Sequence, residues 1–452
     1  MVLTALQPRK DAGRRLRFYK LLTSGTGRGC RLRSRGKLSA DMVIKRGVVM
    51  KCKGIGLSYR VGAFVLTGLL GLGGPVQGAT QLAGERGEGT QAPVGAGNTI
   101  VHSKFGGQIF GFDIDQNGTE GVLSEAQTLS NGNVLAAVET FDQKSGKILK
   151  VVSKIESKDD FLTLGIVGTS VGLVEREHVT GIYVTKRIYE ELNPLSANKI
   201  TGTWTPALAA DDIILGISRN QGTPTTAVLY FENTANNFDT FVFGSNVGAN
   251  TFEPTVELTD PTFMFSNAPQ VAYDSVTSQV VVASSDSAVG GPPPEFALVD
   301  LSTGTVDKFT GIPGPPPFRQ GSINGLAVDS EDGIACTTTE LDFRVEFYNL
   351  KAQTGFAVVL PGANGQLQSG SDVEYDPVNK LFFVAQSVSS TGTRSSIQVY
   401  NTSGTLVESL NGFNFSNAFN VIGTHIALNP SNRSGYVDGP DSGVTEIQSF
   451  TY

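Results

Sequence analysis

The chain has 452 residues, of which 39% are apolar and 17% charged, and this length and composition exclude a largely disordered protein. The formal net charge of -7 combines a basic start with an acidic body. Residues 1–60 hold 16 Lys and Arg against two Asp, whereas residues 81–452 hold 19 Lys and Arg against 40 Asp and Glu. Because an acidic body repels phosphate backbones, we expect no nucleic-acid partner.

The basic start leads into a short apolar run, Val61–Leu72, and then into the small residues Val76–Ala79. This order is typical of a secretory signal peptide, and the run is too short for a membrane-spanning helix, which needs about 20 residues. We therefore predict a signal peptide over 50–79, preceded by an over-extended or disordered basic N-terminus over 1–49. The alternative is a basic transit or nucleic-acid-binding arm, which leaves the apolar run unexplained.

These features predict a secreted, periplasmic or cell-surface protein with no stable membrane span after signal cleavage. Cys30 and Cys52 would leave with the leader, so that Cys336 alone remains and no intramolecular disulfide can form. Cys336 lies in an apolar, strand-like run, and we expect a buried, unreactive thiol.

Residues 80–99 are rich in Gly, Ala, Gln and Thr and predict a flexible lead-in, with ordered structure from about Ile100. Beyond this point, short runs of β-branched and aromatic residues alternate with Asn-Gly, Ser-Gly and Thr-Gly turns. Helical periodicity is nearly absent, which predicts an all-β chain. The best helical candidate is the short segment Lys186–Leu192.

One strand pattern recurs four times in the second half of the chain. The first strand of each unit ends in an acidic or amide residue, at Asp274, Asp329, Asp376 and Asn429, and these positions are 55, 47 and 53 residues apart. Turn glycines after the third strand recur at intervals of 51 and 49, at Gly304, Gly355 and Gly404. The four Asp and Asn side chains are most simply caps of Asx turns.

A period near 50 with four strands per unit is the signature of a β-propeller blade. Residues 100–452 have room for about seven blades. The last unit ends after its third strand, so we expect an N-terminal strand to complete it, with Gly107–Ile114 as the candidate. Such closure would remove an exposed sheet edge.

The strand ending in Asp and the Thr-Gly hairpin resemble the YVTN, NHL and lactonase-like group of seven-bladed propellers over roughly 350 residues. Within that group, Asn324–Asp329 resembles the Asn-Gly strand entry of gluconolactonase/regucalcin-type enzymes, and Asp372–Asp376 is similar to their Asp-bearing entry. The resemblance implies that Asn324 and Asp372 bind a divalent cation, Ca²⁺, and that Asp372 is catalytic. The early Glu-Gly-Pro of that family is replaced here by Glu120-Gly-Val.

The spacing of the units gives the same place independently. Four residues before each repeated Asp or Asn, at the start of the innermost strand, stand Gln270, Gly325, Asp372 and His425, with Asn324 one step earlier. Innermost strands line a propeller channel, so Gln270, Asn324, Asp372 and His425 should converge at its mouth. Their oxygen atoms could hold Ca²⁺, or the polar groups could bind a small polar ligand. The alternative is ordinary loop chemistry and channel water.

Two further motif matches are weak. Gly168–Gly172 fits the G-x-S-x-G nucleophile elbow, but no helix is predicted after it, so we interpret it as a chance match. Asp113–Gly118 fits the opening of a calcium loop, yet the twelfth position is Ser124, with Glu125 one step late. Asn-Gly is also the strongest hairpin signal, and we expect a hairpin there.

The sequence therefore predicts an exported propeller that binds a small polar ligand or an extracellular protein partner as a binding or scaffold module. The alternative is a metal-dependent lactonase or related hydrolase at the channel mouth. In that case Asp372 would act as general base or acid, helped by Asn324, Gln270 and His425.

Overall fold

The computed structural model describes the following residues: 49–50, 59–60, 94–114, 119–157, 161–164, 174–179, 182–187, 189–193, 199–204, 213–219, 225–234, 237–246, 251–252, 256–258, 270–284, 293–313, 323–339, 344–361, 368–388, 395–415, 424–441 and 444–452. The chain divides into two compact units, Met1–Leu69 and Leu70–Tyr452. In the first, β1 (Val49–Met50) pairs with β2 (Tyr59–Arg60). The signal peptide expected over 50–79 lies almost wholly outside the described residues.

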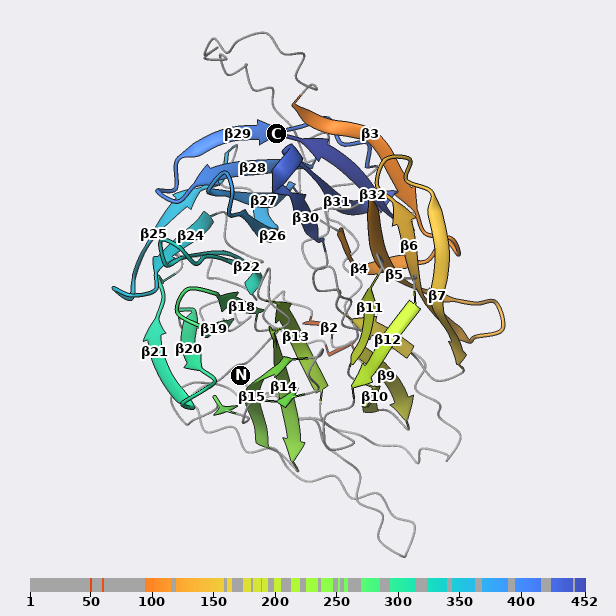
Figure 1. Ribbon diagram of the computed structural model, residues 1–452, viewed down its shortest axis with the longest axis horizontal. Coiled ribbons are helices and arrows are strands. Elements are labelled where there is room, and N and C mark those ends of the chain that lie inside the picture. Colours follow the sequence, from red (N-terminus) through yellow and green to blue (C-terminus); the bar gives the residue numbers. More distant parts are fainter. Residues whose placement is uncertain are drawn as a thin grey trace, which may run out of the picture. The chain divides into compact units, whose positions relative to one another are not determined.

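The described part of the second unit consists of strands and one 3₁₀ turn, Pro430–Asn432. Three consecutive sheets each contain four antiparallel strands in chain order (Figure 1). The first sheet is β18 (Gln270–Asp274), β19 (Gln279–Ser284), β20 (Glu295–Asp300) and β21 (Thr305–Thr310). The second is β22 (Ile323–Asp329), β23 (Ile334–Thr339), β24 (Arg344–Asn349) and β25 (Thr354–Val359). The third is β26 (Gln368–Asp376), β27 (Leu381–Val388), β28 (Ser396–Asn401) and β29 (Leu406–Leu410).

Two more four-stranded sheets are built from the two ends of this unit. One has the order β3-β32-β31-β30, with β3 (Gly95–His102), β30 (Ile426–Asn429), β31 (Ser434–Asp441) and β32 (Val444–Thr451). The other contains β4 (Gln108–Ile114), β5 (Glu120–Thr128), β6 (Val134–Asp142) and β7 (Ile148–Ser157) in chain order.

The segment between these sheets forms three further sheets. The first is β8 (Phe161–Leu164), β9 (Val174–Val179) and β10 (Ile182–Arg187); the second is β11 (Tyr189–Asn193) with β12 (Lys199–Trp204). The third is β13 (Ile213–Arg219), β14 (Thr225–Thr234), β15 (Asn237–Asn246), β16 (Thr251–Phe252) and β17 (Val256–Glu257). The helix predicted over Lys186–Leu192 is wrong, because most of this segment lies in β10 and β11. Seven residues form too short a helix to be stable alone, and pairing with β12 satisfies the backbone instead.

Apolar residues fill the spaces between consecutive sheets. Phe296 contacts Tyr348 between the first and second chain-order sheets, and Phe347 contacts Phe382 between the second and third. Phe383 of the third sheet contacts Phe450 of β32 in the next sheet. Strands β18, β22, β26, β30 and β4 contact one another in this order. Each is an edge strand of its sheet, and we call these five the first strands. Four-stranded sheets that bury both faces against similar sheets make a β-propeller, so the predicted fold is confirmed. Seven blades remain a prediction.

The closing strand is N-terminal, as expected, but it is not Gly107–Ile114. β3 pairs antiparallel with β32, with Val101 opposite Ile447, and begins inside the segment expected to be a lead-in (Figure 1). The Gln448 amide donates a hydrogen bond to the carbonyl oxygen of Gly97 at 2.8 Å. β4 instead opens its own sheet. An outermost strand needs little apolar surface, so the polar composition of 95–99 concealed it.

The repeated Asp residues cap the turns as predicted. The Oδ1 atoms of Asp274, Asp329 and Asp376 each accept the backbone N–H groups two and three residues later. Asn429 accepts the hydroxyl of Ser431 at 2.7 Å. Four residues after these caps, the backbone is left-handed, at Ser278, Gly333, Lys380 and Arg433.

In the turns after the third strands, the left-handed conformation falls at Gly304 and Gly404 but at Gln353 rather than Gly355. Gly355 lies in β25, where an added Cβ would stand 2.6 Å from the Tyr348 ring. Its role is thus close approach to that ring and not the turn that we expected.

Cys336 is fully buried, as predicted, and burial together with the charge of Glu346 raises the pKa of its thiol well above the usual range. No helix among the described residues has the length and hydropathy that membrane crossing requires.

Replacing Val101 with Asp tests the closing strand. Val101 is 0% exposed, so an unpaired carboxylate there should cost about 3–5 kcal/mol of unfolding free energy. Val359→Asp is the matched control, because Val359 on β25 is 54% exposed and its replacement should cost no more than about 0.5 kcal/mol. Urea unfolding measures both, and equal losses would contradict the placement of β3.

Candidate functional site

The four predicted residues lie at or near corresponding positions of consecutive first strands. Gln270 begins β18, Asn324 is the second residue of β22, Asp372 lies within β26, and His425 directly precedes β30. Since these strands contact one another in this order, the structure places the residues along neighbouring strands, as the repeat spacing predicted.

Three of these side chains connect each first strand to the next. The Gln270 amide donates to the carbonyl oxygen of Ile323 at 3.3 Å, and the Asn324 amide donates to that of Gly370 at 2.9 Å. Oδ2 of Asp372 accepts the N–H of Ile426 at 2.9 Å. We call these three contacts the inter-sheet ties. They give Gln270, Asn324 and Asp372 a structural role beside any role in binding.

Gly325 explains the close approach of β22 to β26, which the Asn324 tie connects. An added Cβ on Gly325 would stand 2.5 Å from the backbone nitrogen of Val373 and 2.9 Å from the carbonyl carbon of Asp372. Only glycine permits this approach, which brings Asn324 within reach of β26.

His425 is oriented by a second-strand carboxylate. Its Nδ1 lies 3.2 Å from Oδ2 of Asp438, and its backbone N–H donates to Oδ1 of the same residue at 2.5 Å. Asp438 is 1% exposed, whereas the His425 side chain is 35% exposed. Burial lowers the pKa of His425, but the charge and hydrogen bond of Asp438 and the charge of Asp372 outweigh it, so the pKa is raised.

Asp372 interacts with this histidine electrostatically. Burial raises its pKa to about 7, against the opposing effects of the His425 charge and of the N–H groups of Ile426 and Val373. The pKa of the neighbouring Glu374 is also raised well above its usual range, by burial first and then by the charges of Asp372 and Asp113. A carboxyl group that titrates near neutral pH beside a fixed imidazole can donate or accept a proton in the physiological range.

The residues expected to hold a cation do not by themselves make a calcium site. Ca²⁺ takes about six to eight oxygen ligands, and Asn324 and Asp372 supply two side chains. Within the described ranges, no group of three His, Cys, Asp or Glu residues is arranged to hold a metal ion.

The weak motifs have different outcomes. The hairpin predicted from Asn117-Gly118 is present, since β4 pairs antiparallel with β5 on either side of it, although Asp115–Gly118 themselves lie outside the described residues. Ser124, the twelfth position of the calcium-loop match, lies opposite Gly111 within this sheet. Gly168–Gly172 lie outside the described residues, and a strand, β9, follows them.

Sequence reasoning missed a buried polar position in the third strands. The pattern is an apolar residue, Glu or Gln, any residue, then Phe or Tyr, and its polar members are Glu139, Glu346, Gln398 and Gln448. Each is at most 3% exposed. The Glu or Gln always stands two residues before the Phe or Tyr, so an alignment of the third strands would have found this position from the sequence.

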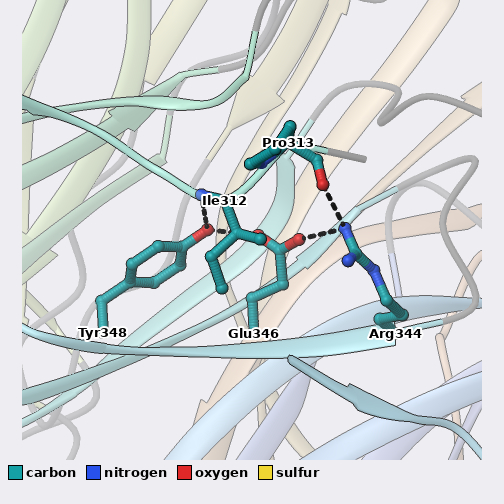
Figure 2. A network of polar contacts seen from close by, with 5 residues as sticks. All are labelled: Ile312, Pro313, Arg344, Glu346 and Tyr348. Atoms are coloured by element: carbon teal, nitrogen blue, oxygen red, sulfur yellow. Dashed lines mark hydrogen bonds and ion pairs between the residues drawn. The ribbon is translucent and has the colours of Figure 1, made fainter. Parts of the chain in front are cut away.

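Figure 2 shows how one of these residues is satisfied. Glu346 lies between Arg344, whose guanidinium is 2.8 Å from Oε1, and the hydroxyl of Tyr348, which donates to Oε2. Arg344 also donates to the carbonyl oxygen of Pro313 at 3.3 Å, and Tyr348 accepts the N–H of Ile312 at 3.2 Å. The network thus fixes the segment leaving the preceding sheet.

No protein-family model matches the sequence, and no curated protein matches it either. Among solved structures, U3-55K is similar over 79% of this chain and 100% of its own, with 13% identity and a TM-score of 0.52. The hydrazine synthase of Kuenenia stuttgartiensis is similar over 78% of this chain and 97% of its own, with 12% identity and a TM-score of 0.50. The β-propeller domain of the Trilobed protease from Pyrococcus furiosus covers 76% of this chain and 95% of its own, with 7% identity and a TM-score of 0.47. At these identities the likeness concerns the fold alone.

Replacing Asp438 with Asn tests the orientation of His425. The substitution removes the nearest negative charge, so the pKa of His425 should fall. Side-chain NMR titration of the His425 imidazole measures it. An unchanged His425 pKa would contradict the pairing.

Because the folded-state pKa of His425 is raised, the pair stabilises the fold fully below the unfolded pKa of 6.5, and the contribution is lost as pH rises through the folded value. Asp438→Asn should therefore destabilise the protein more at pH 6 than at pH 8.

Proposed function

We propose that this chain is an exported β-propeller that binds a small polar ligand or an extracellular protein partner, as a binding or scaffold module. The observation that carries the proposal is that one of the four side chains at the first strands remains partly exposed while the other three bind the neighbouring strand. Gln270, Asn324 and Asp372 are engaged in the inter-sheet ties, while His425 keeps a partly exposed imidazole fixed by Asp438. A rigid polar group on a rigid scaffold favours recognition.

The chemistry of this group limits the ligand. The imidazole can donate and accept hydrogen bonds, and the neighbouring Asp372 carboxyl changes charge near neutral pH. A ligand with hydroxyl, amide or amine groups meets both requirements, whether it is a free small molecule or part of a protein. Export rests on the order of basic, apolar and small residues over 50–79.

The second candidate is a metal-assisted lactonase or related hydrolase. It is favoured by Asp372, whose pKa near neutral suits a general acid or base, and by the strand entries at Asn324 and Asp372 that resemble gluconolactonase/regucalcin-type enzymes. In this alternative the ties would have to hold Asp372 in place for catalysis.

Metal analysis, a panel of lactones and a thermal-shift screen of small polar compounds, all on the purified full chain, separate the two. The proposal predicts no stoichiometric divalent metal and no lactone turnover. It also predicts a compound that stabilises the protein, by about 2.7 kcal/mol at a hundred times its Kd, and that loses its effect in His425→Ala.

His102→Ala is the matched control, since His102 is a surface histidine on β3, and it should respond to the compound like the unmodified chain. One bound Ca²⁺ per chain, with lactone turnover that Asp372→Ala abolishes, would overturn the binding proposal in favour of the hydrolase.

A further inference from the structure

The connector between the closing strand β3 and β4 is held by two buried carboxyl groups. The backbone N–H of Lys104 donates to Oε2 of Glu139 at 2.8 Å. The N–H groups of Phe105 and Gly107 donate to the two oxygens of Glu125, at 3.0 and 2.7 Å. Both glutamates are 0% exposed. We call residues 103–107 together with Glu125 and Glu139 the closure joint.

The two glycines of the connector are required by this arrangement. Gly106 is left-handed, with a φ of 70°. A Cβ on Gly107 would stand 2.6 Å from the carbonyl oxygen of Ala126 and 2.8 Å from Oε2 of Glu125. A side chain at Gly107 would therefore collide with β5 and with the Glu125 carboxyl group, whereas Gly106 is favoured by its left-handed backbone.

Glu125 and Glu139 face each other across β5 and β6. Glu125 on β5 lies opposite Ala137 on β6, and Glu139 follows Ala137 by two residues on β6. Both glutamate side chains therefore lie on one face of the sheet. Oε1 of Glu139 is buried without a hydrogen-bond partner. A proton between the two groups would satisfy this oxygen.

The corresponding positions of other sheets avoid this problem. Glu346 is neutralised by Arg344 at 2.8 Å. Gln398 and Gln448 are uncharged amides, and Gln448 both donates, to the carbonyl oxygen of Gly97, and accepts, from the N–H of Asn414. Of the two carboxyl groups at these four positions, Glu346 is paired with Arg344, whereas Glu139 has the acidic Glu125 beside it.

The cations around the joint lie in solvent. Lys104 is exposed, and the ammonium of the exposed Lys154 on β7 lies 4.8 Å from the centre of the Phe105 ring. On the facing sheet, His102 of β3 pairs with Glu446 of β32 at 2.7 Å. Exposed ammonium groups compensate a buried pair of carboxylates poorly, since water screens them.

We propose that Glu125 and Glu139 share one proton and that this proton makes closure of the propeller pH-dependent. With the proton present, one carboxyl group donates to the other and both still accept the connector N–H groups. Without it, two buried carboxylates repel each other and their hold on the connector weakens. Closure is therefore tightest when the pair is protonated.

The titration of Glu139 agrees with this geometry. Burial, followed by the charge of Glu125, raises its pKa from 4.5 to about 7, against the N–H of Lys104. Because the folded-state pKa lies above the unfolded value, the folded protein holds more protons between these two pH values. Its stability should fall as pH rises from about 4.5 to about 7, and then level off.

Glu139→Gln reproduces the neutral side chain found at Gln398 and Gln448 and removes the titration. Urea titrations of the full chain give the factor by which the unfolding constant rises between pH 5 and pH 8. This factor should be at least about ten times larger for the unmodified protein than for Glu139→Gln. Glu346→Gln is the matched control: it loses a buried acid that is already neutralised by Arg344, so its pH dependence should equal that of the unmodified protein. Equal pH dependence of Glu139→Gln and the unmodified protein would overturn the proposal.

A second measurement needs no variant. Trypsin can cleave after Lys104, which lies in the connector, and its rate can be divided by that on a reference peptide at each pH. The normalised rate should rise about tenfold from pH 6 to pH 8 in the unmodified chain. A flat normalised rate would refute the shared proton even if Glu139→Gln failed to fold.

Discussion

The fold depends on one constraint, that each four-stranded sheet is apolar on both faces and needs a neighbour on both. The β26–β29 sheet shows it, with Phe382 packed on one side and Phe383 on the other. A row of such sheets leaves two apolar faces unless its ends meet. The chain meets the requirement through β3, which pairs with β32 and contributes Val101 to the cluster shared with β4 and β5.

This constraint decides what the polar residues do. Side chains at the strand entries provide hydrogen bonds between neighbouring first strands, from β18 to β22, from β22 to β26 and from β26 to β30. The repeated Asp residues cap the turns. In the third strands, Glu139 and Gln448 accept backbone N–H groups of the segments that leave the preceding sheets. Most polar residues that look functional therefore stabilise the fold, and the group around His425 stands out because Asp438 fixes an imidazole that still reaches solvent.

The repeat spacing was enough to predict the all-β fold, the four-stranded unit and the Asx caps, because each is a local consequence of one strand-turn-strand pattern. It also predicted that Asp372 and His425 would lie near each other. Asp438 escaped prediction because it lies in the second strand of its sheet, whereas the repeat pattern points only to the entries of the first strands. Lys186–Leu192 misled because local helical propensity yields to strand pairing, and β3 because an edge strand carries little apolar signal.

Hydrogen exchange of the full chain, followed by mass spectrometry, tests the central claim of closure most directly. If β3 completes the last sheet, the amides of residues 95–102 should exchange slowly and on the same timescale as those of β32, since both belong to one antiparallel pair. Exchange of 95–102 at the rate of an unstructured peptide, with β32 still protected, would contradict the account.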